Sequence, residues 1–219
     1  MIRQIEMISF IKNDTMEPLS AANFATVVAS AIEMEPTRAG QIVGQALLSS
    51  NQGNYLWLIV TDTIAGGSWL TTRIQSGLDA LQNLATTYQH TVYQVHHERS
   101  GNHIRGLAGV GPAGGILRII DLETDARGNA DSLMQATDLI EIHAGNRFGH
   151  LTDAMALLEQ PEGIFSAEVQ TFKLLISHQQ YEGFKHKDIF TTNISKALSE
   201  LNSLAVMSGF NEYQILLSV

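Results

Sequence analysis

The sequence predicts an α+β domain with a mixed or antiparallel sheet, a central strand at 55–61, flanking helices and a mainly helical C-terminal part. The central strand follows from the near-continuous apolar run Tyr-Leu-Trp-Leu-Ile-Val-Thr, which is typical of a strand buried on both faces. Strands and helices do not alternate strictly, which argues against a doubly wound parallel sheet. We expect one domain over 1–219, with a mixed strand and helix part at 1–125 and a helical part at 130–209.

The mixed part contains both kinds of hydrophobic periodicity. Alternating or continuous apolar residues predict strands at 2–11, 55–61, 91–98, 103–109 and 115–122. Apolar residues at helical spacing predict helices at 19–34 and 69–88. A further helix is predicted to begin at Pro36, from the spacing of Ala39, Ile42, Val43, Ala46 and Leu47.

The C-terminal part shows helical spacing in four segments, which are Leu133–Ile140, Leu151–Leu158, Ser166–Ile176 and Ile189–Leu204. Gly209 stands where the last helix is expected to end. Alternation over Tyr213–Val219 then predicts a final strand. The polar stretch Asp121–Asp131 is the best candidate for an exposed linker, and the sequence shows no internal repeat.

The charge balance argues against two classes of partner. The chain has 22 acidic and 13 basic residues, a net charge of −9, and no cluster of Lys and Arg. Phosphate backbones and anionic membrane surfaces both attract clustered basic residues, so nucleic acid and membrane partners are disfavoured. Charged residues make up only 16% of the chain, against about 25% in typical soluble domains. Part of the surface is therefore expected to be covered by a protein partner or by a second copy of the chain.

The absence of cysteine excludes a disulfide scaffold, a thiolate metal site and a cysteine nucleophile. The N-terminus lacks a basic segment followed by a long apolar run, and no stretch approaches the ~20 apolar residues of a transmembrane helix. We therefore expect a cytoplasmic protein, with secretion by a route without a signal peptide left open. We expect no cofactor and no bound metal.

The segment around Gly101-Asn102 holds the main candidate site. If these two residues form a hairpin turn, alternation along both strands places five side chains on one face: His96, Glu98, Ser100, His103 and Arg105. The candidate catalytic residues are His96, Glu98, His103 and Arg105. Either histidine would act as a general base, Glu98 would orient it, and Arg105 would bind an anionic group. The alternative is an ordinary cross-strand charge pair between Glu98 and Arg105, with solvated histidines.

Three other segments have simpler interpretations. Gly109–Gly114 matches a short glycine fingerprint of dinucleotide-binding proteins, but the strand and helix that should flank it are missing, which favours a turn. Asp62 follows the predicted central strand, where it either contacts a ligand or caps a turn. His143–His150 contains two histidines at a spacing that fits no known metal motif.

Two classes of function follow. The first is a non-enzymatic interaction or assembly protein, favoured by the lack of a catalytic motif, the low charge and the amphipathic C-terminal segments. The alternative is a small hydrolase or transferase that uses the His96, Glu98, His103 and Arg105 cluster.

Overall fold

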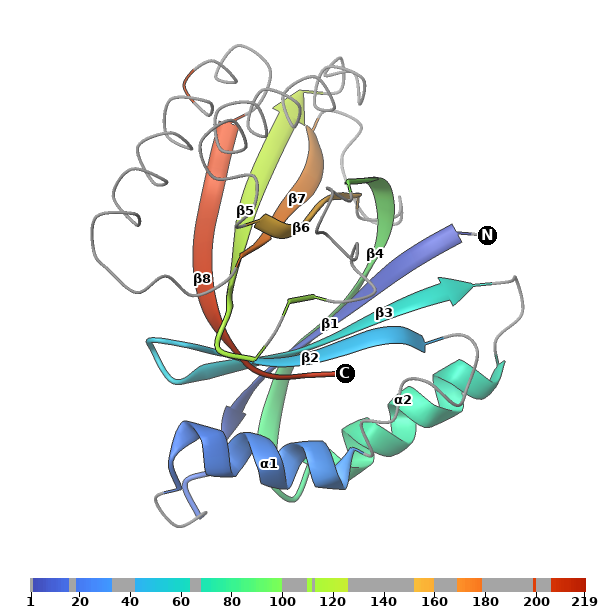
Figure 1. The fold of residues 1–219 in the computed structure, drawn as a ribbon. Helices are drawn as coiled ribbons and strands as arrows, with labels where there is room; N and C mark the ends of the chain where they lie inside the picture. Colours follow the sequence, from blue (N-terminus) through green and yellow to red (C-terminus); the bar gives the residue numbers. More distant parts are fainter. Residues whose placement is uncertain are drawn as a thin grey trace.

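Eight strands within the described residues form one closed antiparallel barrel (Figure 1). The computed structural model describes residues 2–15, 19–32, 42–63, 68–99, 110–111, 113–125, 152–159, 169–178, 199 and 206–219. The elements are β1 (Ile2–Lys12), α1 (Ala21–Ala31), β2 (Ile42–Ser50), β3 (Asn54–Thr63), α2 (Ser68–Leu81), β4 (Ala85–Arg99), β5 (Ile116–Asp125), β6 (Thr152–Glu159), β7 (Val169–His178) and β8 (Val206–Ser218).

The barrel consists of two units with the same strand order. The first unit is ordered β4-β1-β3-β2 and the second β8-β5-β7-β6, and the pairs β2–β8 and β4–β6 join them into a ring. In the first unit, α1 connects β1 to β2 and α2 connects β3 to β4, which is the β-α-β-β-α-β order of a ferredoxin-like unit. The structure therefore contains a duplication that the sequence does not show.

Two β-bulges confirm that the units are related residue by residue. The β1–β4 register shifts between Ser9 and Phe10, and the β5–β8 register shifts between Asp121 and Leu122. Matching these shifts makes Asp121 the counterpart of Ser9, and it makes Tyr213 the counterpart of Tyr93. Bulges bend a strand at a defined position, so their repetition shapes both halves of the barrel alike.

The predicted helix-rich α+β fold is wrong, and three of its helices are strands. The helix expected after Pro36 is β2, and the segments Leu151–Leu158 and Ser166–Ile176 contain β6 and β7. Each of these strands is buried on both faces, as consecutive residues show: Ala46, Leu47 and Leu48 in β2, and Leu174, Leu175 and Ile176 in β7. A continuous apolar run satisfies helical spacing as well as strand spacing, so periodicity cannot separate the two.

Other predicted elements coincide with the structure more closely. β3 covers the run expected at 55–61 and is buried on both faces, although a closed ring has no central strand because every strand has two neighbours. The helix expected at 69–88 ends at Leu81, and its last residues already belong to β4. The predicted final helix, Ile189–Leu204, and the segment Leu133–Ile140 lie outside the described residues, apart from Ser199.

The barrel wall separates two layers of apolar side chains. The inner layer draws on all eight strands and includes Ile5, Leu58, Leu117 and Leu175. The outer layer of the first unit lies between its strands and the helices α1 and α2 (Figure 1). It includes the stacked rings of Phe10 and Tyr55 and the tilted ring of Phe24.

α1 and α2 are fixed by local features of their sequences. The Ser20 hydroxyl caps α1 by accepting a hydrogen bond from the backbone N–H of Asn23 at 3.2 Å. On α2, Gly77 lies against the indole of Trp57, so closely that a Cβ there would stand 2.6 Å from a ring carbon. The Trp57 indole in turn donates a buried hydrogen bond to the Gln45 side chain at 3.1 Å. Within the described residues, no helix is long and apolar enough to cross a membrane.

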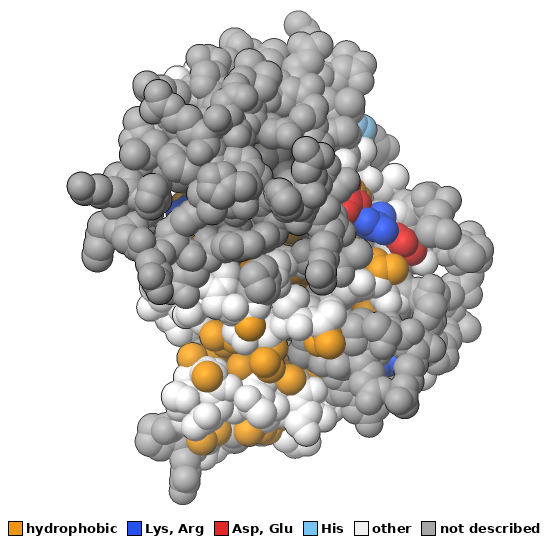
Figure 2. Space-filling view, viewed as in Figure 1, with side chains coloured by type: hydrophobic (Ala, Val, Ile, Leu, Met, Phe, Trp, Pro, Cys, Tyr) orange, Lys and Arg blue, Asp and Glu red, His pale blue; other side chains and the backbone are white. Residues whose placement is uncertain are grey.

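The face of the molecule drawn in Figure 2 bears few charges among its described residues. Figure 2 shows apolar side chains (orange) gathered over the lower part of the molecule, where Figure 1 places α1, β2 and the C-terminus, with charged groups confined to a few points. Val27 and Val219 are among the exposed apolar residues. This agrees with the low charged fraction of the chain.

Candidate functional site

A cavity of about 230 Å³ opens inside the barrel, at the end where β1 and β2 finish and β3 and β4 begin. Apolar residues such as Met7 and Leu56 contribute to its wall, and the remaining lining is mainly polar. The lining residues are Met7, Ser9, Asn54, Leu56, Tyr88, Gln89, Thr91, Tyr93, Ile119, Asp121, Lys173, Asn211 and Tyr213. Both units contribute, so the cavity exists only because the two units close into one ring.

The two sides of the cavity correspond to each other but carry different chemistry. Counterparts related by the duplication are Ser9 and Asp121, Leu56 and Lys173, Gln89 and Gly209, Thr91 and Asn211, and Tyr93 and Tyr213. The tyrosines are thus repeated on both sides. The first unit offers a serine and a leucine where the second offers a carboxylate and an ammonium group.

Asp121 and Lys173 are direct neighbours across the β5–β7 ladder, and the Lys173 ammonium donates to the Asp121 carboxylate. Their side chains are only 21% and 19% exposed. On its other side Asp121 faces Gly209 of β8, where a Cβ would lie 2.5 Å from the carboxylate oxygen Oδ2. The absence of a side chain at Gly209 therefore makes room for the carboxylate at this position.

Tyr93 and Tyr213 of the cavity stay protonated near neutral pH. Burial raises the pKa of Tyr93, while the charge of Lys173, whose ammonium lies 5.6 Å from the centre of the ring, acts in the opposite direction. Burial also raises the pKa of Tyr213, and Tyr88 and Asp121 add to the effect. Both phenols therefore act as neutral hydrogen-bond donors and acceptors.

The resulting set of groups is suited to proton transfer. Asp121 can accept a proton, and the Lys173 ammonium beside it can stabilise negative charge that develops on a bound molecule. The phenols of Tyr93 and Tyr213 and the amide of Asn211 supply neutral hydrogen bonds around them.

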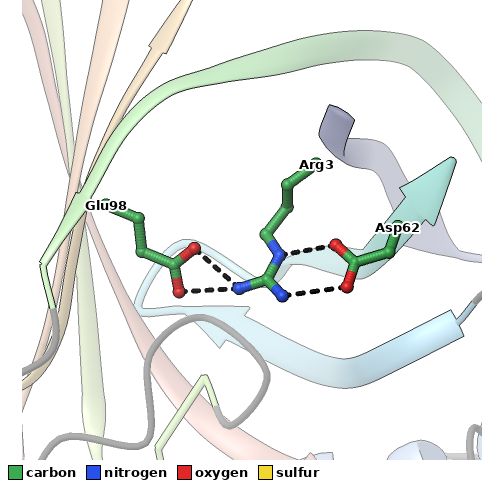
Figure 3. A network of polar contacts seen from close by, with 3 residues as sticks. All are labelled: Arg3, Asp62 and Glu98. Carbon is green, nitrogen blue, oxygen red and sulfur yellow. Dashed lines mark hydrogen bonds and ion pairs between the residues drawn. The ribbon is translucent and has the colours of Figure 1, made fainter. Parts of the chain in front are cut away.

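A second polar cluster lies at the opposite end of the barrel, where β1 begins and β3 and β4 end (Figure 3). The Arg3 guanidinium donates to Asp62 at 2.8 and 3.0 Å and to Glu98 at 2.7 and 2.9 Å. The hydrogen bond from Arg3 is the main cause that lowers the pKa of Asp62, and the same bond raises the pKa of Arg3. This arrangement of one cation between two carboxylates ties three strands together.

The predicted hairpin site is only partly described. Glu98 binds Arg3, and His96 faces Glu159 of β6 at 3.5 Å between Nδ1 and Oε2. The β4–β6 register shifts between Val95 and His97, so the strict alternation assumed for this strand does not hold there. His103 and Arg105 lie outside the described residues, as do Gly101 and Asn102. The four-residue site stays a prediction.

Sequence reasoning did not single out the cavity residues. Lys173 stands within the apolar run from Phe172 to Ile176, and Asp121 stands between Ile120 and Leu122. A charged residue between buried apolar neighbours is costly to bury unless it is paired, and that is the signal that could have identified both. The sequence instead predicts Asp121 as the first residue of an exposed linker, whereas the structure places it within β5.

Comparisons with known proteins establish the fold. No family model and no curated protein matches the chain. A candidate monooxygenase of Fusobacterium nucleatum matches with a TM-score of 0.65 and 8% identity, over 99% of this chain and 94% of that one. An anthrone oxidase-like protein matches with a TM-score of 0.56 and 10% identity, over 99% and 92% of the two chains. A haem-binding protein of Thermus thermophilus matches with a TM-score of 0.57 and 11% identity, over 98% of this chain and 90% of that one.

These likenesses correct the main functional expectation. A non-enzymatic assembly protein is contradicted, because proteins with this fold along nearly their whole length are named for oxygen chemistry or haem binding. The enzyme alternative fits better. At such low identities the comparisons show the fold alone, and the activity has to be argued from the site. The expected self-association, absence of a cofactor and cytoplasmic location stay predictions.

Haem does not fit the barrel cavity. Its volume of about 230 Å³ lies below the roughly 300–1,000 Å³ of typical ligand pockets, and none of the lining residues that the structure describes is a histidine. Tyrosine can ligate haem iron as a phenolate, but burial raises the pKa of Tyr93 and Tyr213 and disfavours that form. Among the described residues, no group of three or more His, Cys, Asp or Glu could hold a metal ion.

Proposed function

We propose that this protein is an enzyme that binds a small organic molecule in the barrel cavity and removes a proton from it, as the first step of its oxidation by O₂. The observation that carries the proposal is the Asp121–Lys173 pair, which supplies a base and a cation side by side among described lining residues that are otherwise uncharged.

The roles of the residues follow from their chemistry. Asp121 accepts a proton from an activated CH₂ group of the substrate, and the Lys173 ammonium stabilises the oxygen on which the resulting negative charge is delocalised. Tyr93 and Tyr213, which are both protonated, orient the substrate through hydrogen bonds. The absence of a side chain at Gly209 leaves room for the carboxylate itself, which packs against the β8 backbone there.

O₂ is proposed as the oxidant because two structural neighbours are named as a candidate monooxygenase and an anthrone oxidase-like protein. The overall reaction balances without a further reductant, because a CH₂ group and O₂ give a carbonyl group and water. The electrons that reduce O₂ come from the deprotonated substrate. The chain's own residues need only generate and hold that carbanion.

The test is O₂ uptake with a panel of one- and two-ring compounds that contain an acidic CH₂ group. Oxindole is a convenient member, because its oxidation to isatin can be followed by absorbance. We expect turnover by the wild type and a fall of about 10²–10⁴-fold in Asp121→Asn, which keeps the shape but removes the base.

The matched control is Glu123→Gln, the same change of carboxylate to amide at an exposed position two residues along β5. It should retain the wild-type rate. The proposal fails if no compound of the panel is consumed faster by the wild type than by Asp121→Asn.

A further inference from the structure

We infer that the cavity selects small, uncharged molecules of one or two rings and rejects carboxylates and amines of similar size. This inference rests on the proposed function in taking the barrel cavity as the substrate site. It adds the class of substrate, and it can be tested by binding alone.

The size of the cavity sets the first limit. Liquid water occupies about 30 Å³ per molecule, so about 230 Å³ corresponds to roughly eight waters. The walls are strands of a closed ring, with Ile119 and Leu56 packed into the inner core, so they cannot move apart without breaking ladder hydrogen bonds. A space of this size favours ligands of one or two rings over larger ones.

The charges of the lining set the second limit. Among the described lining residues, Asp121 is the only acid and Lys173 the only base, and the two form an ion pair with each other. A carboxylate or an ammonium group brought into the cavity would have to compete for a partner that is already engaged. An uncompensated charge in a partly buried site is costly, so charged ligands are penalised whichever sign they carry.

The neutral lining groups set the third requirement. Asn54, Gln89, Asn211 and the hydroxyl of Tyr213 present both donors and acceptors to the cavity. A ligand with a carbonyl or hydroxyl group can satisfy them, whereas a pure hydrocarbon would leave them without partners. The selected class is therefore a neutral ring compound that carries oxygen.

The asymmetry between the two units gives the ligand a direction. Asp121 and Lys173 belong to the second unit, and their counterparts Ser9 and Leu56 are uncharged. Beside Asp121 the strand is bare at Gly209, while its counterpart Gln89 has a long side chain in the lining. The acidic CH₂ group of a neutral ligand is therefore directed toward Asp121 on β5, on the side where β8 lies.

The test compares three ligands of similar size by calorimetry: oxindole, benzoate and benzylamine, with anthrone as a three-ring probe. We expect the wild type to bind oxindole at least roughly tenfold more tightly than either ion. Anthrone should not bind in the cavity.

Two charge variants make the test sharp. Asp121→Asn leaves Lys173 without its counter-charge and should shift the preference toward benzoate, while Lys173→Gln should shift it toward benzylamine. Glu123→Gln should change neither ratio. Opposite shifts in the two variants cannot arise from a general loosening of the fold, and either variant alone is informative if the other does not fold.

The inference is overturned if the wild type binds benzoate or benzylamine as tightly as oxindole, or if the charge variants leave the order of the three ligands unchanged. Selective binding of oxindole without O₂ uptake would support the inference and refute the oxidase proposal. O₂ uptake with equal binding of neutral and charged ligands would support the oxidase proposal and refute the inference on ligand class.

Discussion

Replacement of Gly209 by alanine tests whether the absence of a side chain at this position of β8 fixes the Asp121 carboxylate, the proposed base. In the native structure a Cβ at this position would lie 2.5 Å from Oδ2, 3.2 Å from Cγ and 3.3 Å from Cβ of Asp121. Ordinary contacts of a Cβ begin at 3.4 Å, so the carboxylate oxygen must retreat by about 0.9 Å, from 2.5 to 3.4 Å. Rotation of the carboxylate relieves the shortest contact only, because two further atoms of Asp121 are also too close.

The expected cost follows from these contacts. Overpacking of this kind destabilises a protein by about 1–3 kcal/mol. For a domain of this size each kcal/mol shifts Tm by about 2–4 °C, so Gly209→Ala should melt about 2–12 °C below the wild type. A misplacement of about 1 Å at a catalytic group can cost on the order of 10²-fold in rate, so turnover should fall further than stability alone explains.

Calorimetry of four proteins isolates the contact: the wild type, Gly209→Ala, Asp121→Ser, and the double variant. Serine is too short to reach the new methyl group, so adding Gly209→Ala to Asp121→Ser should cost little or should stabilise the strand. The reasoning is refuted if Gly209→Ala keeps the wild-type Tm, or if its cost is the same in both backgrounds.

Two further predictions concern the walls of the barrel. Arg3→Gln should lower the free energy of unfolding by about 1–3 kcal/mol at pH 7, because two partly buried carboxylates lose their charged partner. In the folded state the pKa of Asp62 lies below its ordinary value of 3.8. The pairing of Asp62 with Arg3 therefore stabilises the fold fully above pH 3.8, and this stabilisation is lost as the pH falls through the folded-state pKa. Urea melts should therefore show the gap between wild type and variant narrowing below about pH 4, and a gap that widens on acidification would contradict the assignment. Gly77→Ala should cost about 1–3 kcal/mol by forcing α2 away from the Trp57 ring, which lies 2.6 Å from the new Cβ. Calorimetry and tryptophan fluorescence should detect the change together, and an unchanged Tm would show that α2 can shift freely.

The elements that could be predicted from the sequence are those with one unambiguous period. α1 is buried on one face only, and its helical spacing identifies it. β6 and β7 are apolar on both faces, so their residues fit a helical stripe equally well, and only the hydrogen bonding of the ring decides between the two. The helix assigned to 69–88 continued too far because Ala85 and Tyr88 extend the apolar spacing of α2 into β4.

The cavity could not be predicted for a different reason. Asp121 and Lys173 are 52 residues apart in the chain and meet only because β5 and β7 pair in one register. Tyr93 joins them from the other unit, across a junction that depends on ring closure. No local pattern contains such information. The signal that was present locally, a charge within each apolar strand, indicates a buried partner but not its identity.

The duplication explains why a single charged pair can be kept in this cavity. If Ser9 and Leu56 matched their counterparts Asp121 and Lys173, two acids and two bases would face one space of about 230 Å³. Each acid would then have an alternative base, and desolvating four charges would cost far more than desolvating two. Because the first unit contributes only the neutral Ser9 and Leu56 at these positions, Asp121 pairs with Lys173. The Asp121 carboxylate packs against Gly209 of β8 on its other side. Introducing Asp at position 9 should therefore weaken the distinction between neutral and cationic ligands, even though the site of substitution lies on the opposite wall.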